Sequence, residues 1–422
     1  MPDEHDPIEH AQPSWTRTAL LAADKRELAE LCDPTTGVVR PAPHDRLLED
    51  LISPFSAKLR AYMNFRGLPY RRVRFDTELY IQTMPRLVGF PIMPVILTAE
   101  GRVMQDTTPI IAHFERERGD PHPRTTPTHD PALAWLSCLI EDFADEYMPR
   151  LIMLTRWGTP EGANALAHRI ARRMSWSRPE SDHQQLAGFV LARQRGFDRH
   201  LAITSATRPD LEAQLLELIA LLEVRLGEHR FLLGDRPSTA DFALFGPLWA
   251  HIHMDPSSAG LLEIHGRRTC DWLETIEEFG DARGAAGNEA RLGDWLRLDQ
   301  APESLINLLV FVAQTYLPNA RATAAASVAR KKIYTVEIRG ITSEFSTYHY
   351  RAWSFEQVQL GYQALAADHR ARLDPLLERA GLLPGLLADG VLHNGLYDGL
   401  TPPFVVDGIG DNRVAHRRAH KS

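Results

Sequence analysis

The sequence predicts an α/β domain followed by an all-α domain and an appended C-terminal α+β segment. Over residues 45–120, short runs with strand periodicity alternate with amphipathic runs, which is typical of an α/β domain. Over residues 128–298, apolar residues recur at helical spacing, which predicts a domain of helices. Residues 299–422 add a strongly apolar helix and a strand-like run, and residues 1–44 form an extension interrupted by Pro and Gly.

Composition and charge argue against several classes of function. The formal net charge of −8 argues against a nucleic-acid partner, because phosphate binding needs clustered Lys and Arg. No apolar run approaches the roughly 20 residues of a membrane span, so no membrane partner is expected. The N-terminus lacks the apolar core of a signal peptide, and Cys32, Cys138 and Cys270 stand far apart without a CxxC pair. We therefore expect a reducing, cytoplasmic location.

The α/β domain is expected to follow the order β-α-β-α-β-β-α. Gly67-Leu68-Pro69 ends the first long helix, and Glu100-Gly101 turns the chain between the two strands of a hairpin. Six of these seven elements are given bounds: a strand over 46–52, a helix over 53–66, strands over 70–75, 92–97 and 102–105, and a helix over 107–117.

Helices dominate most of the remaining chain. The expected helices cover residues 18–32, 132–157 (one long helix or a helix pair), 211–226, 239–253 and 304–324. In the appended segment, residues 331–339 predict a strand with 347–353 as its candidate partner, and residues 354–380 predict a helix. The Gly-, Pro- and Asp-rich residues 389–422 predict largely irregular structure.

The helix over 53–66 begins with Ser53-Pro54-Phe55-Ser56. Ser is a favoured N-cap and Pro is tolerated at the first helical position, so one interpretation is a helix cap and nothing more. The other interpretation is chemical, because a hydroxyl at the positive end of a helix stabilises a bound thiolate. A thiol whose anion is favoured in this way is more nucleophilic at neutral pH.

Two further segments have both a structural and a functional interpretation. In Ile92-Met93-Pro94-Val95, a Pro enters a buried strand. Either a plain turn precedes the strand, or a cis Met93–Pro94 bond leaves the Met93 backbone free to pair with an extended peptide. In Gln105-Asp106-Thr107-Thr108-Pro109, the polar residues either cap a helix alone or bind an amino acid that carries both charges. Free N–H groups would then take its carboxylate, and Asp106 its amino group.

A fourth motif, at residues 238–241, follows the other three along the chain. Ser238-Thr239-Ala240-Asp241 is a capping-box variant that starts a buried helix and has a structural role. Taken together, SPFS, IMPV, QDTTPII and FLLGDRPSTADFALF resemble the glutathione S-transferase superfamily over about residues 46–297. The resemblance implies a thioredoxin-like N-terminal domain and an all-α C-terminal domain. It also implies glutathione as co-substrate, no metal, and a homodimer.

The resemblance also implies a set of site residues. Ser53 matches the thiolate-stabilising Ser of the serine-type members and is the catalytic candidate. Arg86 is the candidate for the glycine carboxylate. Asp in place of the family's Glu shortens one side chain by a methylene. The glutathione-binding candidates are Phe55, Met93 (whose backbone would hold the cysteinyl part), Pro94 (the cis-proline), and Asp106 and Thr107 (which would hold the γ-glutamyl group).

Different classes of function remain open on the sequence. The first is a glutathione transferase that acts on a small electrophile of unknown identity. The second is a binding or scaffold protein that keeps the fold without the chemistry, and the third is a glutathione-dependent reductase or dehalogenase. The carboxylates at 141, 142, 145 and 146 are expected to line the cleft between domains, since no Glu-x-x-His motif accompanies them as a metal site would require.

Overall fold

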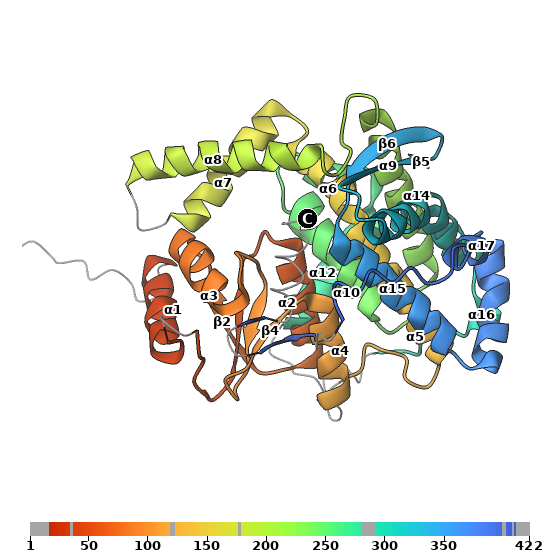
Figure 1. Cartoon of the computed structure of the whole chain (residues 1–422), viewed down its shortest axis with the longest axis horizontal. Coiled ribbons are helices and arrows are strands. Elements are labelled where there is room, and N and C mark those ends of the chain that lie inside the picture. Colours follow the sequence, from red (N-terminus) through yellow and green to blue (C-terminus); the bar gives the residue numbers. More distant parts are fainter. Residues whose placement is uncertain are drawn as a thin grey trace, which may run out of the picture.

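The computed structural model describes residues 17–33, 37–118, 123–175, 179–280, 292–398, 402–406 and 409–410. Within this part of the chain, a mixed sheet with flanking helices packs against a larger body of helices (Figure 1). Residues 1–16 of the expected extension and 411–422 of the expected irregular tail lie outside it. No helix of the described part combines the length and apolar character that crossing a bilayer requires.

The sheet carries the four strands expected in the α/β domain. β1 pairs in parallel with β2 and antiparallel with β3, and β3 pairs antiparallel with β4. The expected strand over 92–97 begins only at Val95, because Pro94 has no N–H to give to the ladder. The bounds are Asp45–Glu49 (β1), Tyr70–Arg74 (β2), Val95–Leu97 (β3) and Val103–Gln105 (β4).

Both faces of the sheet are buried by helices, which gives the domain its thioredoxin-like layers. Leu47, Ile96 and Met104 join the core shared with α2 and α4, whereas Leu48 and Val95 join a second core beneath α1 and α3. Gly67 adopts a left-handed φ of 63° and ends α2 as expected. These helices are α1 (Arg17–Leu31), α2 (Pro54–Arg66), α3 (Met84–Val88, after a π-helical turn at Leu79–Thr83) and α4 (Thr107–Glu117).

The helical domain follows. The expected helix over 132–157 is a pair, and the expected helix over 239–253 becomes π-helical from Leu248, directly after Pro247. Ser238 and Asp241 form the expected capping box. The bounds are Pro131–Glu146 (α5), Met148–Trp157 (α6), Pro160–Met174 (α7), Glu180–Asp198 (α8), Arg208–Glu228 (α9), Thr239–Pro247 (α10), Leu248–His253 (π-helix), Ala259–His265 (α11) and Arg267–Glu277 (α12), with 3₁₀ turns at Glu278–Gly280 and Leu298–Gln300.

The domains meet where α10 packs against α2. Gly246 permits the close approach, because a Cβ at this position would stand only 2.5 Å from the carbonyl oxygen of Pro54. The start of α2, where Ser53 lies, is therefore pressed directly onto a buried helix of the second domain.

The appended segment corrects two expectations. α14 (Glu303–Val328) leads into a hairpin of β5 (Ile333–Ile338) and β6 (Ile341–Ser346), so the expected partner strand over 347–353 is wrong. Arg339 and Gly340 both have positive φ, which forms a tight two-residue turn and starts the partner strand at once. The expected helix over 354–380 is two helices, α15 (His349–Ala364) and α16 (Ala367–Arg379), and α17 (Leu383–Leu386) follows.

The appended segment is joined to both domains. Phe311, Phe355 and Leu373 belong to the same buried cluster as the apolar residues of α5 and α10. The expectation of irregular structure after residue 389 is incomplete, because β7 (Phe404–Val406) pairs antiparallel with β4 and β8 (Ile409–Gly410) pairs with β7. The sheet order is therefore β2-β1-β3-β4-β7-β8.

Candidate functional site

Ser53 is the N-cap of α2, as one of its two interpretations predicts. Its Oγ accepts a hydrogen bond from the N–H of Ser56 over 3.3 Å, and Pro54 occupies the first helical position. The capping bond uses the hydroxyl oxygen only as an acceptor, so the hydroxyl proton remains able to donate. Ser53 is half-buried and lines a cavity, so its capping role leaves it accessible to a ligand.

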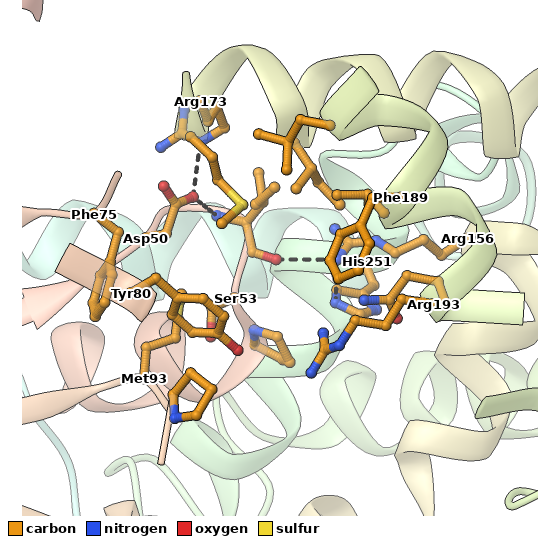
Figure 2. A pocket seen from close by; sticks show the side chains of 18 of the residues that line it. Asp50, Ser53, Phe75, Tyr80, Met93, Arg156, Arg173, Phe189, Arg193 and His251 are labelled. Atoms are coloured by element: carbon orange, nitrogen blue, oxygen red, sulfur yellow. Dashed lines mark hydrogen bonds and ion pairs between the residues drawn. The ribbon is translucent and has the colours of Figure 1, made fainter. Parts of the chain in front are cut away.

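That cavity, the apolar chamber, has a volume of about 380 Å³. Aromatic and thioether side chains from both domains surround it, and Figure 2 shows Phe75 and Tyr80 on the side of the sheet domain and Phe189 on the side of α8. Ser53 lies where these two sides meet. Its lining includes Ser53, Phe75, Tyr80, Met93, Trp157 and Phe189. Such a surface suits a hydrophobic or aromatic ligand.

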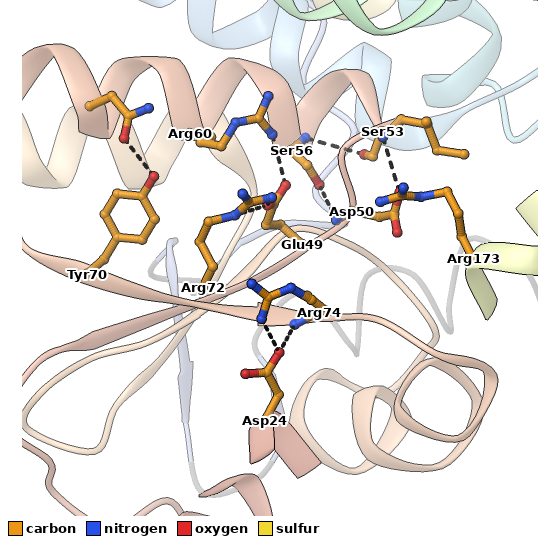
Figure 3. Close-up of polar contacts among 12 residues, drawn as sticks. Asp24, Glu49, Asp50, Ser53, Ser56, Arg60, Tyr70, Arg72, Arg74 and Arg173 are labelled. Atoms are coloured by element: carbon orange, nitrogen blue, oxygen red, sulfur yellow. Dashed lines mark hydrogen bonds and ion pairs between the residues drawn. The ribbon is translucent and has the colours of Figure 1, made fainter. Parts of the chain in front are cut away.

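Two arginines of the helical domain hold the residues before Ser53 (Figures 2 and 3). Arg156 donates from Nη1 to the carbonyl oxygen of Ile52 over 3.1 Å. Arg173 donates from Nε to the Asp50 carboxylate over 2.7 Å, and the same carboxylate oxygen accepts from the Ile52 N–H over 3.2 Å. The loop that positions the Ser53 hydroxyl is thus tied across the domain interface.

Arg156 is itself fixed by a buried cluster. Its Nε and Nη2 donate to the two carboxylate oxygens of Asp255 over 2.5 and 3.1 Å, and its Nη1 also faces His251 Nε2. Burial and the adjacent Arg156 charge hold the pKa of His251 well below its usual value. His251 is therefore a neutral imidazole that accepts from Arg156.

A second cavity, named the polar chamber for the carboxylates of Asp106, Asp145 and Glu146 in its lining, has a volume of about 460 Å³. The Met93–Pro94 peptide bond is cis, as the second interpretation of that segment predicts. Ser53 itself lines the apolar chamber, and Pro54 and Met93 border both chambers. The structure thus brings all the candidate residues except Arg86 to two adjoining cavities. Those in the polar chamber are Phe55, Met93, Pro94, Asp106 and Thr107.

Asp106 does not behave as the cap that the sequence suggests. It precedes α4 with a positive φ of 77°, and its side chain makes no capping hydrogen bond. Instead, its carboxylate accepts a hydrogen bond from the hydroxyl of Tyr350. Burial raises the pKa of Asp106 to about 7, against the lowering effects of this bond and of the Lys58 charge. Next to it, Gln105 is buried and also lines the chamber, and its Oε1 has no hydrogen-bond partner.

Three of the four α5 carboxylates, Glu141, Asp145 and Glu146, face the interface as expected, but they are paired. Asp142 instead accepts hydrogen bonds from Tyr316 and Ser354 of the appended segment. Lys58 of α2 bonds to Glu141 over 2.7 Å and to Asp145 over 2.5 Å, and its side chain is only 1% exposed. Burial alone would lower the pKa of Lys58, but these carboxylates outweigh it and raise the pKa above its usual value. Glu146 pairs with Arg351 over 3.0 Å. In the described part of the chain, no group of three or more His, Cys, Asp or Glu side chains is arranged to hold a metal.

Sequence reasoning missed several residues that build the site. Lys58 sits in a helix where a charged residue normally indicates a solvated face, and Tyr350 and Arg351 fall in the run taken for a strand. Arg156 and Trp157 are candidates on the sequence either for the wall of a cleft or for an ordinary interface, and both line the apolar chamber. Arg193 of α8 lines both chambers. Arg86, the candidate for a carboxylate, lines neither chamber and belongs to a separate cavity beside α1.

Comparison with family models gives two matches. The model described as glutathione S-transferase, N-terminal domain, matches residues 47–122. The model described as glutathione S-transferase, C-terminal domain, matches residues 193–254. The first match includes every candidate site residue, and the second includes Arg193 and His251.

Solved structures of low identity also match. A rice glutathione S-transferase in complex with glutathione is 17% identical, with a TM-score of 0.33 over 60% of this chain and 93% of its own. The β-etherase LigF from a Sphingobium strain is 19% identical, with a TM-score of 0.40 over 56% of this chain and 98% of its own. A glutathione transferase from Phanerochaete chrysosporium is 17% identical, with a TM-score of 0.40 over 56% and 98%. Among curated proteins, no match to this chain is found.

Proposed function

We propose that this chain, which carries the N- and C-terminal domains of the glutathione S-transferase superfamily, binds glutathione and activates its thiol for attack on an electrophile. One observation carries the proposal: a single cavity collects Phe55, Met93, Pro94, Asp106 and Thr107, and it adjoins the cavity of Ser53 through Pro54 and Met93. A tripeptide with a charged amino-acid end and a central thiol could place its charged end in the first of these cavities and its thiol near Ser53.

The polar chamber supplies partners for the γ-glutamyl end. The Asp106 carboxylate and the unpartnered Gln105 Oε1 are both acceptors, which an ammonium group requires. The first N–H groups of α4, at Thr107 and Thr108, have no partner within the helix and favour a carboxylate. The Met93 backbone lies between the chambers, where the cysteinyl part would pass.

The thiol would then lie at the start of α2. The Ser53 hydroxyl donates a hydrogen bond to the thiolate, and the helix end adds a favourable field, so the thiol releases its proton to solvent at a lower pH. The thiolate electron pair forms the new carbon–sulfur bond, and the leaving group departs with the electrons of the bond it breaks. The electrophile itself would occupy the apolar chamber.

The test is a Ser53→Ala variant assayed for conjugation of glutathione to an aromatic halide. We expect kcat/KM at neutral pH to fall roughly 10–100-fold, since each pKa unit lost by the thiol costs about tenfold in thiolate. Thr159→Ala is the matched control. Thr159 is another N-cap followed by Pro, its Oγ1 accepts from the Gly162 N–H over 3.1 Å, and it lines neither chamber. Equal activity of the Ser53→Ala variant and the wild type would remove Ser53 from the reaction.

A second function, glutathione binding without turnover, is favoured by one observation. Asp106 is shorter than the family's Glu and shares its carboxylate with Tyr350, so it holds an amino group less strongly. Calorimetric binding of glutathione by the wild type, together with no conjugation of any aromatic halide tried, would select this alternative.

A further inference from the structure

We propose that the appended segment forms part of the ligand site, in which Tyr350 and Arg351 of α15 close the polar chamber beside Asp106, the carboxylate of its lining that has no ion pair among the described residues. This inference rests on the proposed function and deepens it. The residues concerned lie outside both family models, which end at residue 254. They are positioning and specificity residues rather than catalytic ones.

The start of α15 forms a wall of the chamber. Tyr348, Tyr350 and Arg351 line the same cavity as Phe55 and Asp106. The Tyr350 ring is held by aromatic neighbours, with ring centroids 5.5 Å from Trp353 and 6.2 Å from Tyr397. This packing restricts the direction in which the Tyr350 hydroxyl points, and that hydroxyl donates to Asp106.

Arg351 fixes a second carboxylate of the chamber. Its Nε donates to Glu146 over 3.0 Å, and the two side chains are only 12% and 13% exposed. The guanidinium also lies 4.9 Å from the centroid of the Tyr348 ring. Because the pair is partly buried and constrained on two sides, it holds Glu146 as a neutralised partner.

Contacts along α5 make this wall a fixed part of the fold. Ser354 and Tyr316 both donate to the Asp142 carboxylate. One helical turn or more away, Trp135 donates from Nε1 to the carbonyl oxygen of Val358 over 2.8 Å. Figure 1 shows α15 lying along α5 over this length. The wall is therefore anchored at several points rather than hinged like a lid.

Asp106 differs from the other carboxylates of the chamber in having no ion pair among the described residues. Three carboxylates line the chamber, namely Asp106, Asp145 and Glu146. Asp145 shares the Lys58 cation with Glu141, and Glu146 is paired with Arg351. Tyr350 gives Asp106 a hydrogen bond but no charge, and the Arg193 guanidinium also belongs to the lining. The titratable groups that interact electrostatically with Asp106 are Lys58, Glu141, Asp145, Glu146, Tyr350 and Tyr397. Arg193 and Arg351 line the same chamber.

Tyr350 also sets the pH range in which Asp106 can bind an amino group. Burial raises the pKa of Asp106 to about 7, and the Tyr350 hydrogen bond opposes this rise. Removal of the hydroxyl therefore raises the pKa of Asp106 further. Since only the ionised carboxylate holds an ammonium group, glutathione binding would then begin at a higher pH.

The experiment measures the Kd of glutathione by calorimetry between pH 6 and 9 for the wild type and Tyr350→Phe. We expect affinity to fall about 5–10-fold at pH 7 and to approach the wild-type value at pH 9, as the carboxylate ionises in both. Tyr362→Phe is the matched control. It lies on the same helix and also deletes a Tyr–Asp hydrogen bond, to Asp374 over 2.7 Å, but it does not line the chamber.

The outcomes separate this inference from the proposed function. If the wild type binds no glutathione at any pH in the range, the proposed function fails. If the wild type binds and Tyr350→Phe follows the same pH profile, only the role of the appended segment fails. A second test uses the wild type alone and does not depend on the folding of the variant. A glutathione analogue without the α-amino group should show no rise in affinity as the pH increases through 7. If its affinity rises as much as that of glutathione, the inference is overturned.

Discussion

Arg156 in the helical domain donates a hydrogen bond to the carbonyl oxygen of Ile52, the residue that precedes Ser53 in the sheet domain. The same guanidinium is paired with the buried Asp255. The orientation of the Ser53 hydroxyl thus depends on a contact made from another domain. The two roles of Arg156 can be tested separately. Its ion pair with Asp255 contributes to the stability of the fold, and its hydrogen bond to Ile52 positions the loop before Ser53.

We expect Arg156→Leu to lower the free energy of unfolding by about 3–5 kcal/mol, because the buried Asp255 carboxylate then keeps only the longer ion pair with Arg169, at 3.5 Å. Activity should fall roughly 10–100-fold, since the loop before Ser53 loses its donor. Urea unfolding and conjugation kinetics measure the two effects.

The double variant Arg156→Leu/Asp255→Asn distinguishes these effects. It should recover about 1–3 kcal/mol of the lost stability, because the buried charge of Asp255 is removed, while its activity stays low. If activity recovers together with stability, the contact to Ile52 has no positioning role.

The Ser53→Asp variant separates the capping role of Ser53 from its role in the reaction. Asp is as good an N-cap as Ser and its charge suits the helix end, so stability should be kept, whereas Ser53→Ala should lose about 1 kcal/mol. Conjugation should nevertheless fall at least as far with Asp as with Ala, because a carboxylate has no proton to donate at neutral pH and repels a thiolate. Thermal unfolding and initial rates test this, and an active Ser53→Asp variant would leave only the capping role.

The sequence predicted best those features that a single residue type imposes on the backbone. Gly67 ends α2, the Ser53-Pro54 pair starts it, and α4 has the bounds expected. The hairpin of the appended segment was misplaced because its turn, Arg339-Gly340, has Arg at the first positive φ, where Asn or Asp is the usual signal.

Residues that act through distant partners could not be predicted in the same way. A Lys in an amphipathic helix indicates a solvated face unless its partners are known, and the partners of Lys58 lie on α5. Tyr350 carries no local signal for contact with Asp106, because the two meet only after the appended segment packs along α5. The candidates that came from ordered motifs were found, whereas those that came from tertiary packing were missed.

Lys58 should be essential to the domain interface at neutral pH. We expect Lys58→Met to lower the free energy of unfolding by about 3–5 kcal/mol at pH 8, since Glu141 and Asp145 remain buried without their cation. Burial already raises the pKa of Asp145, and loss of the Lys58 charge, which lowers that pKa, would raise it further. The variant therefore loses stability as the pH rises through the interval between the unfolded and folded pKa values of Asp145, and the loss is smaller at pH 5. Urea unfolding at both pH values measures this difference. Arg297→Met, which breaks an ion pair at the surface, should leave stability unchanged.

Asp106→Asn should trade ligand affinity for stability. Burial raises the pKa of Asp106 to about 7, above its usual value, so the fold is destabilised when this carboxylate ionises. The wild type therefore has its full stability below about pH 4 and loses stability as the pH rises towards 7. Asn removes the charge, tolerates the positive φ at this position and still accepts from Tyr350. At pH 8 the variant should therefore be more stable than the wild type by up to about 4 kcal/mol, at about 1.4 kcal/mol for each of roughly three pKa units, with little difference at pH 4. Its glutathione affinity should fall at pH 8, because a neutral amide binds ammonium weakly. Chemical denaturation and calorimetry at the two pH values test both parts, and a variant destabilised at pH 8 would show that Asp106 is stabilised as an anion by the fold itself.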